Sequence, residues 1–195
     1  MTEPNTDDQG HPPPGGPRNT IWRTAWPTAL AVVVTAGTAY GLGDARNAAP
    51  VVAASGLVYL AAAATGRRQM AWIGFAVTFV LIGLAKFVGF DAVPWLLGMA
   101  GVLLLVGVVG RRTSPWWSFP LQAAAMLMLG SIAFVALRSD PMLGGLLVAV
   151  ALLAHAGWDI HHHRTDRVVN RSLAQFCAVL DILVAALVAI VALSS

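Results

Sequence analysis

Seven long apolar stretches alternate with short polar connections along the chain. A helix needs roughly 20 residues to cross the hydrocarbon core of a bilayer, and about 17 is the lower limit. The pattern therefore predicts an all-α, polytopic membrane protein with a compact bundle of about seven transmembrane helices. We expect these helices at residues 25–42, 48–65, 70–90, 92–110, 118–138, 141–161 and 172–193, the second and the fourth being the shortest for a span.

Proline positions support these helix starts. A proline in the first turn of a helix costs nothing, because the N–H it lacks has no partner there. Five prolines stand near predicted starts: Pro27, Pro50, Pro94, Pro120 and Pro141. The connections are short, so neighbouring helices are expected to pack antiparallel.

Residues 1–22 differ from the rest in being rich in proline, glycine and polar side chains. Such a segment cannot bury a core, so we expect a disordered tail in which His11 is inert. Residues 23–195 then form one transmembrane domain. We expect its first apolar stretch to be a retained helix rather than a cleaved signal.

The overall composition agrees with a membrane protein. The chain is 57% hydrophobic and only 11% charged, with a mean hydropathy of +0.72, whereas a soluble domain carries roughly 25% charged residues. The isoelectric point near 9.8 does not indicate nucleic-acid binding, because the basic residues lie in short connections. A single cysteine, Cys177, excludes an internal disulfide and a cysteine-based zinc motif.

Arginine placement predicts the orientation. With a cytoplasmic N-terminus, nine basic residues lie on the cytoplasmic side and three on the other, which follows the positive-inside rule. The nine are Arg18, Arg23, Arg67, Arg68, Arg111, Arg112, Arg164, Arg167 and Arg171. We expect a bacterial inner or plasma membrane, since the bias toward Ala, Gly, Val and Arg resembles that of a high-GC bacterium.

The candidate chemistry lies in one stretch, HAGWDIHHH, which starts at His155. On a helix, His155, Asp159 and His162 fall within roughly 60° of one another, with His163 beside them and His161 pointing elsewhere. An ionised Asp in hydrocarbon needs a partner. Asp181 lies on the next predicted helix, so its economical pairing is with His155, and Tyr59, Gln122 and Cys177 could line the same pocket.

A divalent metal is the simplest use of these groups. We expect Asp159 with His162 or His163 to hold the ion, and His155 to be a further ligand. Nitrogen and oxygen ligands suit Zn, Fe or Mn. His155 or Asp181 is the candidate catalytic general base. The alternative is a His–Asp pair that serves only packing, with His161 to His163 as solvated interfacial residues.

The pattern HxxxDxxHH resembles the histidine boxes of integral-membrane metal enzymes such as fatty-acid desaturases and hydroxylases. Those families carry several boxes, whereas this chain has one, with Asp159 where such a box has His. The segment also resembles a motif of uncharacterised small multipass bacterial membrane proteins. The first resemblance implies a metal-dependent reaction on a lipid.

The sequence is compatible with three functions. The first is a membrane hydrolase or oxidoreductase that acts on a lipid-like or isoprenoid substrate, which enters from the cytoplasmic leaflet. The second is a transporter coupled to protons or metal ions, with the His/Asp cluster as its relay. The third is a non-enzymatic assembly subunit. Membrane lipids and a hydrophobic small molecule are the expected partners, and nucleic acid is not.

Overall fold

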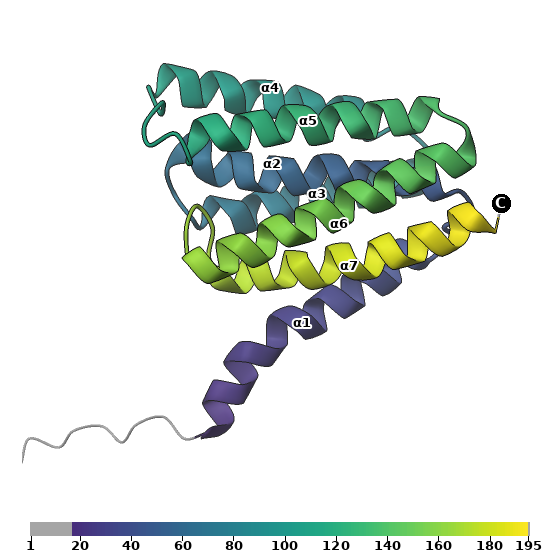
Figure 1. Ribbon diagram of the computed structural model, residues 1–195, viewed down its shortest axis with the longest axis horizontal. Coiled ribbons are helices and arrows are strands. Elements are labelled where there is room, and N and C mark those ends of the chain that lie inside the picture. The colour runs from purple at the N-terminus through teal and green to yellow at the C-terminus, as the bar shows by residue number, and fades with distance from the viewer. Residues whose placement is uncertain (1–16, 195) are drawn as a thin grey trace, which may run out of the picture.

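The computed structural model describes residues 17–194, which form helices and no strand. Consecutive helices run back and forth across the bundle (Figure 1). Each predicted helix overlaps an observed one, so the predicted all-α bundle is confirmed over these residues. The elements are α1 (Pro17–Ala39), the short 3-10 helix η1 (Ala45–Ala48), α2 (Ala49–Thr65), α3 (Met70–Val88), α4 (Val93–Val109), α5 (Phe119–Arg138), α6 (Pro141–Thr165) and α7 (Arg171–Leu193).

Helix α1 begins earlier than the sequence pattern predicts. Its first residue is Pro17, so residues 17–22, which the pattern assigns to the disordered tail, belong to the helix. Residues 1–16, and with them His11, lie outside the described residues. Helix α1 packs on α7, and its N-terminal part leaves the bundle (Figure 1).

Helix α2 is the centre of the bundle. Every residue from Val52 to Ala64 is buried, because α3, α4, α5 and α6 all pack against it. A helix that is apolar on all sides can lie in a protein core or in a membrane, and here its four neighbours bury it. Its many alanines let the neighbouring helices approach closely.

Five described helices are long and apolar enough to cross a membrane: α2 together with η1 (Ala45–Thr65), α3, α5, α6 and α7. Two apolar stretches are shorter, at Thr24–Ala39 and Val93–Val109. The second predicted helix is long enough for a span, because η1 extends it to 21 residues. The fourth, now α4, remains short.

The connections divide the bundle into two ends. The arginine-rich end carries the connections 66–69, 110–118 and 166–170, where Arg68 bonds to the side chain and backbone of Asp166. The opposite end carries the connections 40–44, 89–92 and 139–140. There Arg46 forms an ion pair with Asp44 at 2.6 Å and donates to the carbonyl of Ser139 at 2.8 Å. The hydrogen bond from Arg46 lowers the pKa of Asp44 below its ordinary value.

Candidate functional site: a buried His–Asp–Asp cluster

Three ionisable side chains meet at the interface of α6 and α7. The Nδ1 atom of His155 lies 2.8 Å from Oδ2 of Asp181 and 3.4 Å from Oδ2 of Asp159. His155 is 4% exposed, and both aspartates are fully buried. We call these three residues the triad. Its ligand atoms all lie within 4.8 Å of one another, so the triad could hold a metal ion.

The order of the chain brings the triad together. His155 and Asp159 are one helical turn apart, which places them on the same face of α6. Helices α6 and α7 are antiparallel neighbours, and Val168 in their short connection is thirteen residues from both His155 and Asp181. The two residues therefore reach the same level of the bundle. The predicted pairing of Asp181 with His155 is confirmed.

Helix α2 completes the surroundings of the two carboxylates. The hydroxyl of Tyr59 donates to Oδ1 of Asp159 at 2.6 Å, and the hydroxyl of Ser55 lies 3.4 Å from Oδ1 of Asp181. One atom is left over: Oδ2 of Asp159 is buried and accepts no hydrogen bond. Unsatisfied buried polar atoms are rare in folded proteins and call for an explanation.

His162 belongs to a separate polar cluster beside the triad. Its Nδ1 lies 3.0 Å from the carbonyl oxygen of Trp158, and since a carbonyl only accepts, this nitrogen is assigned the proton. Its Nε2 is then an acceptor and lies 3.3 Å from Nε2 of Gln122. The Oε1 of Gln122 accepts from the indole of Trp158 at 3.3 Å. Both ring nitrogens of His162 are thus used within this cluster.

The other histidines of the stretch lie farther out. His163 is half-buried, and its Nδ1 lies 3.0 Å from the backbone carbonyl of Arg171 at the start of α7. His161 is exposed and stacks on Trp158. Among the described residues, the group that could hold a metal contains His155 and Asp159 of the predicted ligands, gains Asp181, and contains neither His162 nor His163.

The composition of the triad fits a divalent cation. Its two carboxylates carry a charge equal and opposite to that of one such ion, and a neutral imidazole adds a nitrogen ligand. A tetrahedral ion with bonds of about 2.0–2.2 Å separates its ligand atoms by about 3.4 Å. The Nδ1 of His155 and the Oδ2 of Asp159, which accepts no hydrogen bond, already have this 3.4 Å spacing, whereas Oδ2 of Asp181 lies at the hydrogen-bonding distance of 2.8 Å from Nδ1 and would have to move. Three protein ligands leave one position open, as in catalytic zinc sites.

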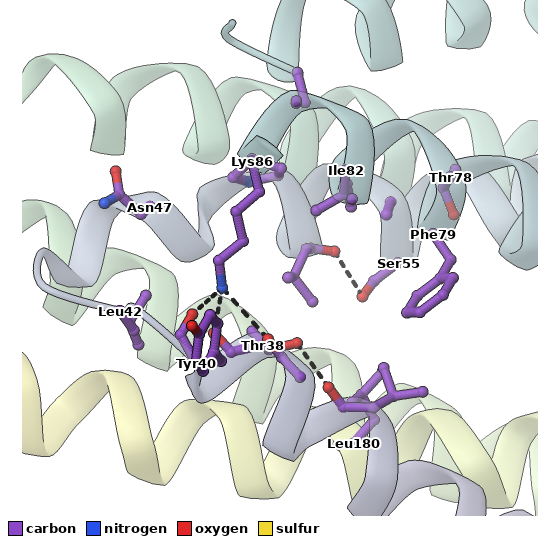
Figure 2. A pocket seen from close by; sticks show the side chains of 18 of the residues that line it. Thr38, Tyr40, Leu42, Asn47, Ser55, Thr78, Phe79, Ile82, Lys86 and Leu180 are labelled. Atoms are coloured by element: carbon purple, nitrogen blue, oxygen red, sulfur yellow. Dashed lines mark hydrogen bonds between the residues drawn. The ribbon is translucent and has the colours of Figure 1, made fainter. Parts of the chain in front are cut away.

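A cavity of about 900 Å³ reaches the triad from the opposite end of the bundle. Asp181 and Ser55 form part of its inner wall, and Cys177 and Phe75 lie beside them. Lys86 stands at its other end, where it bonds to the backbone carbonyls of Thr38 in α1 and of Tyr40 just after it, as Figure 2 shows. Sequence reasoning missed this cavity and the contact of Ser55 with Asp181, since both join helices that are distant in the chain.

Comparisons with protein-family models, with curated proteins and with solved structures give no significant match.

Proposed function

We propose that the chain is a small multi-pass membrane enzyme that binds a divalent metal at the triad and acts on a lipid-like substrate in the cavity. The observation that carries the proposal is the position of Asp181. This residue belongs both to the buried triad and to the wall of the cavity. Asp181 therefore connects a group that can react with a space that can hold a hydrophobic molecule.

The electrostatics of the triad support a bound cation. Two adjacent carboxylates in an apolar bundle are costly, because no water solvates their charge. One imidazole can balance only one of them. A divalent cation would balance both and would use the free oxygen of Asp159. Zn, Fe and Mn all suit one nitrogen and two carboxylate ligands.

The residues of the site would have different roles. Asp181 is the residue of the triad that lines the cavity, so it would be the member of the triad nearest a substrate. Tyr59 holds Asp159, and in the metal-free site His155 holds Asp181 through the same Nδ1 that would become the metal ligand. The metal would supply Lewis-acid or redox chemistry, which corresponds to a hydrolase or an oxidoreductase.

The same proposal includes a membrane location. Five apolar helices are long enough to cross a bilayer, and under the positive-inside rule the arginine-rich end would lie in the cytoplasm. The cavity then lies toward the outer leaflet. The substrate would enter from that side, and not from the cytoplasmic leaflet as the sequence pattern alone suggests.

Lipid profiling tests the enzymatic part of the proposal. Wild-type protein and Asp181→Asn would be produced at equal membrane levels in a bacterial host, beside cells with an empty vector. Asn keeps the shape of Asp but removes the charge. We expect wild type to change at least one lipid species, and we expect Asp181→Asn to leave the profile of the empty vector.

The matched control is His161→Ala, which alters an exposed histidine on the same helix outside the triad. It should behave as wild type. Lipid profiles that do not differ between wild type and empty vector, or that change equally with Asp181→Asn, would contradict an enzyme that uses this site.

Proton-coupled transport is a second candidate, and one observation favours it. Polar contacts run without a gap from Ser55 through Asp181, His155 and Asp159 to Tyr59. Such a chain could pass protons between the cavity and the arginine-rich half of the bundle. Proton flux into proteoliposomes that is lost in Asp181→Asn would support transport, and no flux in wild type would refute it.

A further inference from the structure

The cavity opens sideways between two helices that pack on different partners. Helix α1 lies on α7, and helix α3 lies on α2. The two helices contact each other at the arginine-rich end, where the ring centroids of Trp26 on α1 and Trp72 on α3 are 5.4 Å apart. At the opposite end Lys86 of α3 bonds to carbonyls at the end of α1, including those of Thr38 and Tyr40. Between these two contacts, residues of both helices line the cavity.

Two glycines stand where the crevice has open space. Gly37 on α1 and Gly83 on α3 both line the cavity, and a Cβ atom added to either would meet nothing within 4 Å. The remaining wall is mostly apolar and includes Phe79, Ile82 and Leu180, which Figure 2 shows around the crevice. A volume of about 900 Å³ is in the range of ligand-binding pockets. The shape and lining suit a hydrocarbon chain.

The two ends of the cavity differ in charge. Lys86 is the only Lys or Arg among its lining residues, and it stands at the mouth. Asp91 also lines the mouth, but its carboxylate accepts from the backbone N–H of Val93 at the start of α4, where the helix dipole offsets its charge. The inner end carries the carboxylate of Asp181. The carbonyls at the C-terminal end of α1 offset part of the charge of Lys86 and occupy its N–H donors, so an anionic group at the mouth would replace one of these carbonyls. It is still favoured there over the inner end, where it would meet Asp181.

We propose that this cavity binds an amphiphile with one acyl or prenyl chain and an anionic head group. The carboxylate or phosphate head lies at Lys86, and the chain runs between α1 and α3 toward Asp181. Lys86 is exposed near the end of a membrane-length helix, at the level where lipid head groups lie. The ligand can enter sideways from the bilayer through the crevice.

This binding mode determines which part of the ligand faces the triad. Phe75 lines the inner end of the cavity and Lys86 its mouth, and eleven helical residues separate them by about 16 Å. The part of the ligand nearest Asp181 is therefore a position along the chain and not the head. If the triad is a reaction centre, which rests on the proposed function, its target lies within the hydrocarbon chain.

Cys177 gives a direct readout, since it lines the cavity and is the only cysteine of the chain. We would measure its rate of modification by N-ethylmaleimide on purified protein by intact mass spectrometry. Palmitate, farnesyl phosphate and the neutral hexadecanol would be added in turn. We expect the two anions to slow modification at lower concentrations than hexadecanol, and their relative strength identifies the chain type.

Variants at Lys86 and Gly83 test the two ends of the binding mode. Lys86→Ala should raise the palmitate concentration for half-protection by about tenfold or more, the value of one charge-assisted hydrogen bond. Lys86→Arg should keep protection. Gly83→Phe should fill the crevice and abolish it. Gly98→Phe is the matched control, because a Cβ at Gly98 also meets nothing within 4 Å but this residue lies on α4, outside the cavity.

Equal protection by hexadecanol and palmitate, with no effect of Lys86→Ala, would overturn the anionic head at Lys86. Absence of any protection, together with no palmitate retained by wild type in native mass spectrometry, would overturn ligand binding in the cavity. Metal content measured on the same samples separates the two proposals. Ligand binding that fails while metal is retained refutes only this inference, and binding that persists in metal-free protein leaves it standing.

Discussion

The Nδ1 atom of His155 and the Oδ2 atom of Asp181 are 2.8 Å apart across the interface of α6 and α7. This contact joins the two helices at a level where the polar side chains of Ser55, Tyr59 and Asp159 are buried as well. Asp181 is also one of the residues that line the cavity. The polar contact that joins α6 and α7 is thus also part of the candidate reaction centre.

Tyr59→Phe removes the hydroxyl that donates to Asp159 at 2.6 Å and keeps the ring in place. A buried carboxylate that loses this partner costs about 1–3 kcal/mol. We expect the free energy of unfolding in detergent to fall by that amount, as measured by chemical or thermal denaturation. Tyr40→Phe, at an exposed tyrosine, is the control. Equal stability of the two variants would show that the Tyr59–Asp159 bond contributes nothing.

Two glycines on α6 should respond to alanine in opposite ways. A Cβ at Gly145 would overlap the side chains of Ala45 and Ala192, so Gly145→Ala should lower stability by about 1–3 kcal/mol through overpacking. A Cβ at Gly157 meets nothing within 4 Å. Gly157→Ala should raise stability by about 0.5–1 kcal/mol, because alanine favours the helix. Shifts of the same sign in the two melting curves would refute this packing of α6.

The ion pair of Asp44 with Arg46 should make a pH-dependent contribution to stability. The pKa of Asp44 is lowered in the folded protein by its hydrogen bond to Arg46. A group with a depressed pKa stabilises the fold above its unfolded pKa of about 3.9 and loses this effect as the pH falls through the folded value. Asp44→Asn should therefore melt below wild type at pH 7, and the difference should disappear in acid. A difference that is constant with pH would exclude the ion pair as its cause.

The proposed orientation can be measured with single cysteines. In a Cys177→Ser background, Arg67→Cys places a thiol at the arginine-rich end, and Arg138→Cys places one at the opposite end. A membrane-impermeant maleimide should label Arg138→Cys on intact spheroplasts, and should label Arg67→Cys only after lysis. The reverse pattern would place the arginine-rich end outside the cell.

Much of the fold follows from the lengths of the apolar stretches, because each helix here is a long apolar run between short polar connections. The pairing of His155 with Asp181 also follows, since antiparallel neighbours bring residues equidistant from their connection to the same level. Such reasoning does not predict which residues of α2 contact the two aspartates. Tyr59 is one hundred residues from Asp159, and nothing local in the sequence indicates that α2 is the central helix.

The ligand set of the predicted metal site shows the same limit. Helical spacing places His162 on the face of His155 and Asp159, and the structure does bury it. Its ring nitrogens are occupied by Trp158 and Gln122 instead. Spacing identifies which side chains share a face, but it does not tell which neighbour each of them contacts. That depends on α5, which brings Gln122 to this level.

The most direct test of the central claim is the metal content of purified protein, measured by elemental mass spectrometry on wild type, Asp159→Asn and His161→Ala. Asn at position 159 keeps the shape but removes the carboxylate that carries the free oxygen. We predict about one divalent ion of Zn, Fe or Mn per chain in wild type and in His161→Ala, and its loss in Asp159→Asn. Wild-type protein without such an ion, or equal metal in all three samples, would contradict a metal site at the triad.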